Sequence, residues 1–215
     1  MPQLHRRSVK QADGVYHVFN RGVNKATVFR NAADYAVYIQ YIKDYLQPKL
    51  DSIREICARD LPGQIVTHKV AKLNRIKNYS ESVELLAFCL MPNHIHLLIR
   101  QLNASGVASF LHSQHTRYAM YFNRKYKREG VLFEAKYKSK LVSTDKYLVY
   151  VSKYIHANPS RLCTKVEDYL WSSMTYYQKE RHPLWLHTDL VVKKFVLSPH
   201  ARAYNTYSDY VKDRP

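Results

Sequence analysis

The sequence lacks any long apolar run. No window approaches the roughly 20 uninterrupted apolar residues that a membrane helix requires. The basic segment that begins at Met1 is not followed by the apolar stretch of a secretory signal. Cysteine is scarce, and Cys57, Cys89 and Cys163 are odd in number and widely spaced, unlike a disulfide framework. Together these absences predict a reduced, cytoplasmic protein without a membrane partner.

Acidic residues are the second scarcity. The chain has 17 Asp and Glu residues against 34 Lys and Arg residues, a net charge of +17 and a pI near 9.7. A surplus of this size favours a polyanionic partner. The 19 tyrosines add rings on which unpaired bases can stack between phosphate contacts. An anionic membrane surface is the weaker alternative, because no basic amphipathic helix is evident. We therefore predict a single-stranded nucleic acid as the partner and a nucleoid-associated location.

The hydrophobic pattern alternates between strand and helix periods, without internal repeats or low-complexity segments. We predict strands over residues 14–22, 83–90, 94–100 and 132–142, and helices over residues 31–47, 104–128, 145–158 and 188–196. The second and third strands form either a hairpin or one long strand kinked at Pro92. We interpret residues from about 47 to 80 as a basic, solvated insertion that holds at most a short helix.

This order of strands and helices is typical of an α+β ferredoxin-like sandwich. In that fold a helix pair covers one face of an antiparallel sheet. We expect the other face to be free for a ligand, and the last helix to return a side chain to it. The prediction is a domain over residues 1–160, with the basic insertion inside it, followed by a helical C-terminal extension over residues 161–215.

Two histidines flank one apolar residue in the predicted strand 94–100. Because side chains alternate along a strand, His94 and His96 share one face while Ile95 points to the other. Neutral imidazole is a common ligand of divalent transition metals. The pair therefore indicates half of a metal site, although half-exposed sheet residues are the simpler interpretation of such a pair taken alone.

A nucleophile can come from the predicted helix 145–158. Tyr154 and Asn158 are four residues apart, so they lie on the same helix face one turn from each other. A tyrosine oxygen that attacks a phosphodiester forms a phosphotyrosine bond and releases a 3′ hydroxyl. A divalent ion would polarise the phosphate, and the Asn158 amide oxygen would add a third ligand to the two histidines. A core aromatic residue is the simpler interpretation of Tyr154.

Five blocks of the sequence carry a resemblance to a known family. They are residues 16–22, 91–96, 132–139, 154–161 and 168–173, of which 154–161 reads YIHANPSR and 168–173 reads DYLWSS. In this order they resemble the single-tyrosine HUH transposases of the insertion-sequence-200-like superfamily. The block at 168–173 is similar to that of the branch called REP-associated tyrosine transposases. The insertion at 47–80 is longer and more basic than the family pattern.

The resemblance implies an enzyme that cleaves and transfers single-stranded DNA next to a hairpin. It implies Mg²⁺ or Mn²⁺ as cofactor, a 5′-phosphotyrosine intermediate and a monomer rather than a homodimer. Carried over residue by residue, His94, His96 and Asn158 match the metal site and Tyr154 the nucleophile. Tyr137, a second tyrosine near the expected site, is the alternative nucleophile.

Several basic residues are expected to contact DNA. They are Arg6, Arg7, Lys10, Arg21, Arg124, Lys125, Lys127, Arg128, Lys136 and Lys138. Similar basic leaders in the REP-associated branch suggest that Arg6, Arg7 and Lys10 reach the bases that flank the foot of the hairpin. A plain basic tail that adds only charge explains this leader equally well.

Two functions of other classes remain open at this stage. One is a protein of the same fold that binds hairpin DNA without cleaving it, although the presence of all four predicted site residues argues against a loss of activity. The other is a sheet-based RNA-binding module, which needs exposed aromatic residues on its central strands. Here the central strand offers imidazoles on that face.

Overall fold

The computed structural model describes residues 12–59, 61–134, 136–162, 165–178 and 182–213. Within these residues a four-stranded sheet has the order β2-β3-β1-β4. The strands are β1 (Val15–Arg21), β2 (Val83–Met91), β3 (His94–Gln101) and β4 (Lys138–Val142), and each neighbouring pair is antiparallel. This order and the intervening helices confirm the predicted α+β ferredoxin-like fold. The hairpin, rather than a kinked strand, is the correct alternative for β2 and β3.

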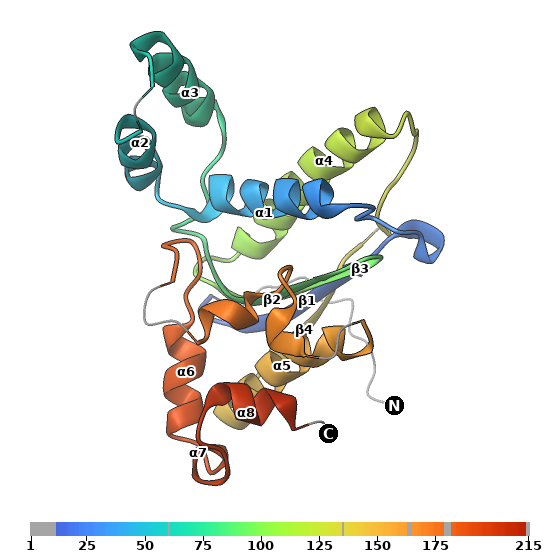
Figure 1. Ribbon diagram of the computed structural model, residues 1–215, viewed down its shortest axis with the longest axis vertical. Helices are drawn as coiled ribbons and strands as arrows, with labels where there is room; N and C mark the ends of the chain where they lie inside the picture. Colours follow the sequence, from blue (N-terminus) through green and yellow to red (C-terminus); the bar gives the residue numbers. More distant parts are fainter. Residues whose placement is uncertain (1–11, 60, 135, 163–164, 179–181, 214–215) are drawn as a thin grey trace.

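One face of the sheet packs against two helices, α1 (Ala32–Leu46) and α4 (Gly106–Lys125), which lie above it in Figure 1. The side chain of Asn31 caps α1 by accepting a hydrogen bond from the backbone N–H of Asp34, as the sequence predicts. Alternate strand residues such as Val18, Leu97 and Ile99 join the helices in a buried cluster. Helices α1 and α4 are therefore the helix pair that the sequence predicts on one face of the sheet.

The opposite face is not free, which corrects the prediction. It is covered by α5 (Asp145–Ala157), as Figure 1 shows. The C-terminal helices α6 (Asp189–Val196) and α8 (Tyr207–Lys212) pack against α5, and α7 (His200–Ala203) packs against α6. A second buried cluster joins strand residues such as Leu98 to α5 and to Phe195 of the extension. The ranges 1–160 and 161–215 therefore share a hydrophobic core.

Two other segments differ from the prediction. The insertion forms α2 (Lys49–Cys57) and α3 (Gly63–Arg75), which extend away from the sheet. Val66, Val70 and Leu73 lie on one face of α3 at helical spacing, but Leu73 is the only residue of this helix that is buried. The predicted strand 132–142 is regular only from Lys138, since Phe133 makes an isolated bridge to Gly22.

Four short 3₁₀ helices complete the described fold, at Val23–Lys25, Asn158–Arg161, Val166–Asp168 and Ser173–Tyr176. Among the described residues, no helix has both the length and the apolar character that crossing a membrane requires.

A buried hydrogen-bond network ties the extension to α5. The fully buried His156 contacts the Tyr207 hydroxyl through Nδ1 at 2.8 Å and the Ser173 hydroxyl through Nε2 at 2.7 Å. Ser173 in turn accepts a hydrogen bond from the backbone N–H of Phe88 on β2 at 2.8 Å. One imidazole therefore connects α5, α8, a 3₁₀ helix and the sheet, and each group in the network has a partner.

We expect His156→Ala to lower the free energy of unfolding by about 3 kcal/mol, because it removes one hydrogen-bond partner from each of two buried hydroxyls and opens a cavity. Urea denaturation followed by circular dichroism measures the change. The control is His68→Ala on the exposed surface of α3, for which we expect a change within about 0.5 kcal/mol. Equal effects of the two substitutions would contradict a structural role for His156.

Candidate active site

Three histidines gather on the α5 face of the sheet. His94 and His96 share this face of β3, as the alternation of side chains predicts. The neighbouring strand β1 adds His17, since the register pairs His17 with Leu98, two residues along the same face from His96. His17 and His96 are buried, whereas His94 is half-buried.

Hydrogen bonds orient the imidazole rings. Nε2 of His17 and Nδ1 of His96 share a hydrogen bond of 2.9 Å, so Nε2 is the nitrogen of His96 that an ion could reach. Nδ1 of His94 donates to the amide oxygen of Asn93 at 2.7 Å, which likewise leaves Nε2 as the possible ligand. The rings of His94 and His96 are 5.0 Å apart between centroids and nearly perpendicular.

The protein environment keeps these imidazoles neutral. Burial lowers the pKa of His17 to about 4. Burial also lowers the pKa of His96 far below its usual range, with smaller contributions from the charges of its neighbours. The pKa of His94 is lowered by burial and then by Arg21, whereas a hydrogen bond with Asn158 raises it. All three rings are therefore uncharged at pH 7, which is the form that binds a metal ion.

Helix α5 brings the predicted tyrosine and asparagine to the histidines. The ring of Tyr154 meets His96 edge-on at 5.7 Å and His17 edge-on at 5.8 Å between centroids. It remains 45% exposed, so a macromolecule can reach its hydroxyl. Asn158 ends the helix, and its Nδ2 donates to the backbone carbonyl of Tyr154 at 2.8 Å. The side chain of Asn158 also forms a hydrogen bond with His94. The Asn158 amide therefore lies beside the imidazoles.

The possible metal ligands are therefore two imidazoles and one amide oxygen. Among the described residues, no group of three or more His, Cys, Asp and Glu side chains is placed to hold a metal ion. A neutral donor set without a carboxylate is nevertheless compatible with a divalent transition metal such as Mn²⁺, whose other ligands would be water or phosphate oxygens. The donor chemistry of His94, His96 and Asn158 fits the predicted cofactor class.

Tyr137, the alternative nucleophile, lies elsewhere. It precedes β4 and packs against the core on the α1 and α4 side of the sheet. It lines a cavity of about 460 Å³ together with Asn20 and Phe133. The structure therefore brings Tyr154, and not Tyr137, to the histidines.

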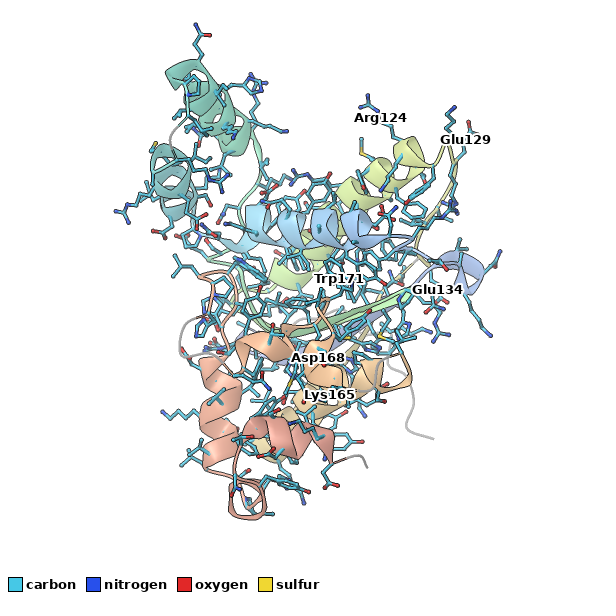
Figure 2. The ribbon with its side chains drawn as sticks, viewed as in Figure 1. Arg124, Glu129, Glu134, Lys165, Asp168 and Trp171 are labelled. Atoms are coloured by element: carbon cyan, nitrogen blue, oxygen red, sulfur yellow. The ribbon has the colours of Figure 1, made fainter. Side chains whose placement is uncertain are left out.

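The predicted DNA-binding residues divide into four groups. Arg21 and Lys138 are exposed at positions that pair with His94 and Phe19, so they lie on the histidine face. Arg124 is exposed at the far end of α4, where Figure 2 shows it projecting away from the sheet, and Lys127 is exposed just beyond. The leader residues Arg6, Arg7 and Lys10 lie outside the described residues.

The remaining basic side chains have local roles. Lys125 donates to the buried carboxylate of Asp34 at 2.6 Å, and Arg128 donates to the backbone carbonyl of Val131 at 2.6 Å. Lys136 lines the cavity that contains Tyr137. Lys125 and Arg128 are therefore less available for phosphate contacts than the sequence suggests.

Sequence reasoning did not assign a role to His17. Alternation places His17, Phe19 and Arg21 on one face of β1, but it does not tell which face that is. The pairing of β1 with β3 decides this, because it sets Phe19 opposite His96 and Arg21 opposite His94. The strand register, together with the histidine hydrogen bond, identifies His17 as part of the site.

A family model resembles part of this chain. Residues 61–158 match a family model described as "Transposase IS200 like". The matched range ends at Asn158 and includes His94, His96 and Tyr154, whereas His17 lies outside it. For this region the match confirms the resemblance predicted from the motifs. No curated protein matches the sequence.

The fold has a similar solved structure, described as "Structure of the REP associates tyrosine transposase bound to a REP hairpin". The two chains are 15% identical, and the similarity covers 88% of this chain and 93% of that chain with a TM-score of 0.47.

Proposed function

Because residues 61–158 match the IS200-like transposase family, we propose that this chain cleaves and rejoins single-stranded DNA next to a hairpin, through a covalent bond to Tyr154. The observation that carries the proposal is the contact of the half-exposed Tyr154 ring with both His96 and His17 on one face of the sheet. A tyrosine with only a packing role would not need three neutral imidazoles and an amide beside it.

The proposed reaction conserves the phosphodiester energy. The Tyr154 oxygen attacks the phosphorus, a bond forms between them, and the bond from phosphorus to the 3′ oxygen breaks. The phenol loses its proton and the 3′ oxygen gains one, which leaves a 5′-phosphotyrosine and a 3′ hydroxyl. Attack by another 3′ hydroxyl reverses these changes and joins the strands.

The histidine face supplies the setting for this step. Its burial holds the imidazoles neutral and in fixed tautomers, which favours metal binding over protonation. We propose His94, His96 and Asn158 as the ligands of Mg²⁺ or Mn²⁺, with Mn²⁺ favoured by the imidazoles. A bound ion would supply polarisation of the scissile phosphate and stabilisation of the departing oxygen. Arg21 adds a positive charge next to His94, where a phosphate would lie.

A cleavage assay tests the proposal directly. The substrate is a single-stranded oligonucleotide with a hairpin, and the protein is assayed with Mg²⁺, with Mn²⁺ and with a chelator. We expect metal-dependent cleavage and a protein–DNA adduct that survives denaturing electrophoresis. Hairpin binding without cleavage under all three conditions would favour the binding protein of the same fold. Preference for an RNA of the same sequence would favour the RNA-binding module.

Binding should depend steeply on salt, because phosphate contacts release counterions from the strand. We expect log affinity to fall linearly with log salt, with a slope of about 0.7 per phosphate contact and several contacts in total. Fluorescence anisotropy of a labelled single strand between about 50 mM and about 200 mM salt measures the slope. A flat response would contradict an interface dominated by phosphates.

A further inference from the structure

Helix α5 carries a face of tyrosines that leads away from the histidines. Tyr147, Tyr150 and Tyr154 are separated by three and four residues, so their side chains form one stripe along the helix. Tyr154 is the member beside the imidazoles, and Tyr150 is 47% exposed. The rings of Tyr147 and Tyr150 are nearly parallel, at 16°, with 6.2 Å between their centroids. The proposed reaction uses only the Tyr154 end of this stripe.

The other end of the stripe opens into a cavity of about 390 Å³ between α5 and the C-terminal helices. Tyr147 and Tyr150 line it from α5, and Tyr204 and Tyr210 line it from the extension. Its volume lies in the range of small-ligand sites, and rings dominate its wall. We name this cavity, with its four tyrosines, the tyrosine cavity.

Positive charge surrounds the tyrosine cavity. Lys146 lines it and is exposed, and Lys153 lines it from a buried position. The Lys153 amine lies 4.3 Å from the centroid of the Tyr210 ring. Outside the cavity, the amine of Lys140 lies 5.0 Å from the centroid of the Tyr147 ring. The carboxylate of Asp213 accepts a hydrogen bond from the hydroxyl of Tyr204, one of the lining residues.

Rings and amines side by side suit one kind of ligand. Unpaired bases stack on aromatic rings without regard to sequence, while their phosphates meet lysine side chains. We infer that the tyrosine cavity binds unpaired bases of the DNA strand whose scissile phosphate reaches Tyr154. This inference rests on the proposed function, and it assigns to Tyr150 and Tyr147 a role in holding the strand rather than in the chemistry.

A double-substitution cycle tests the inference by removing the tyrosine ring from the protein and the base from the DNA, separately and together. We compare wild-type protein and Tyr150→Ala on a labelled single strand and on the same strand with abasic sites beside the scissile position. On the intact strand Tyr150→Ala should bind about tenfold more weakly, as expected for the loss of a stacked base. On the abasic strand the two proteins should bind equally. A structural defect would weaken both strands alike, and that result would overturn the inference.

Two control variants sharpen this comparison. Tyr150→Phe keeps the ring and should bind the intact strand like the wild type. Leu50→Ala removes an exposed apolar side chain from α2, far along the chain from the cavity, and should also bind normally. A loss of binding in Tyr150→Phe as large as that in Tyr150→Ala would overturn stacking as the mode of contact.

Crosslinking of the wild-type protein gives a readout that does not depend on any variant. A strand with 5-iodouracil beside the scissile position is irradiated, and the protein is digested with trypsin. Cleavage after Lys146 and Lys153 releases residues 147–153, which hold Tyr147 and Tyr150 but not Tyr154. We expect crosslinks in this peptide. Crosslinks confined to other peptides would overturn the inference, whereas normal adduct formation at Tyr154 in the same samples would leave the proposed function intact.

Discussion

Replacing Tyr154 with phenylalanine should abolish the covalent protein–DNA adduct and leave hairpin binding nearly unchanged. The substitution removes the attacking oxygen, so we expect the cleavage rate to fall on the order of 10³-fold or more. The ring that contacts His96 and His17 is retained, so the packing of α5 should persist. Denaturing electrophoresis of a labelled strand measures the adduct, and anisotropy measures the binding.

Tyr137→Phe is the matched control for this prediction. Its ring packs on the opposite side of the sheet, where burial raises the pKa of its hydroxyl and disfavours the phenolate. We expect the adduct to form normally in this variant. Should Tyr154→Phe still form the adduct while Tyr137→Phe does not, the assignment of the nucleophile would be wrong.

The parts of the site that the sequence predicts are those with local spacing. His94 and His96 share a face because a strand alternates, and Tyr154 and Asn158 share a face because a helix repeats after about four residues. These relations need only the right secondary structure, and β3 and α5 have it. The approach of α5 to the histidines followed from the predicted fold, since the order of elements in a ferredoxin-like sandwich limits where the last helix can lie.

The contribution of His17 depends on a pairing that is distant in the sequence. His17 and His96 are 79 residues apart, and their hydrogen bond exists only because β1 lies between β3 and β4. A shift of one residue in the pairing of β1 with β3 would place His17 on the opposite face of the sheet, in the core under α1 and α4. The sequence of β1 alone holds no signal that decides between the two faces.

The covered second face was missed for a related reason. The extension is built from short helices of four to eight residues, whose patterns are too brief to show a clear period. Tyr207 and Phe195 are buried only because α5 offers them an apolar surface next to the His156 network. The same packing forms the tyrosine cavity, since two of its tyrosines come from the extension.

Replacing either histidine of β3 with alanine is the second substitution for which we expect a large loss of activity. We expect His96→Ala and His94→Ala to eliminate cleavage and to weaken Mn²⁺ binding. Loss of a residue that only hydrogen-bonds to a metal ligand costs roughly 10- to 100-fold in metal affinity, and the loss of a ligand itself should cost more. The reason is the small number of ligands, because one imidazole and one amide cannot hold a divalent ion in place. Isothermal titration with Mn²⁺ measures the affinity independently of any cleavage.

The neighbours of the two histidines should give a graded series in the same titration. Asn158→Ala should be milder, since water can replace a neutral oxygen ligand. His17→Ala should fall between the two, because it removes the hydrogen bond that fixes the His96 ring without removing a ligand. A thermal melt of each variant is the control for folding, since His17 and His96 are buried. Unchanged Mn²⁺ affinity in both His94→Ala and His96→Ala would refute the two-histidine site, whatever the effect of these variants on cleavage.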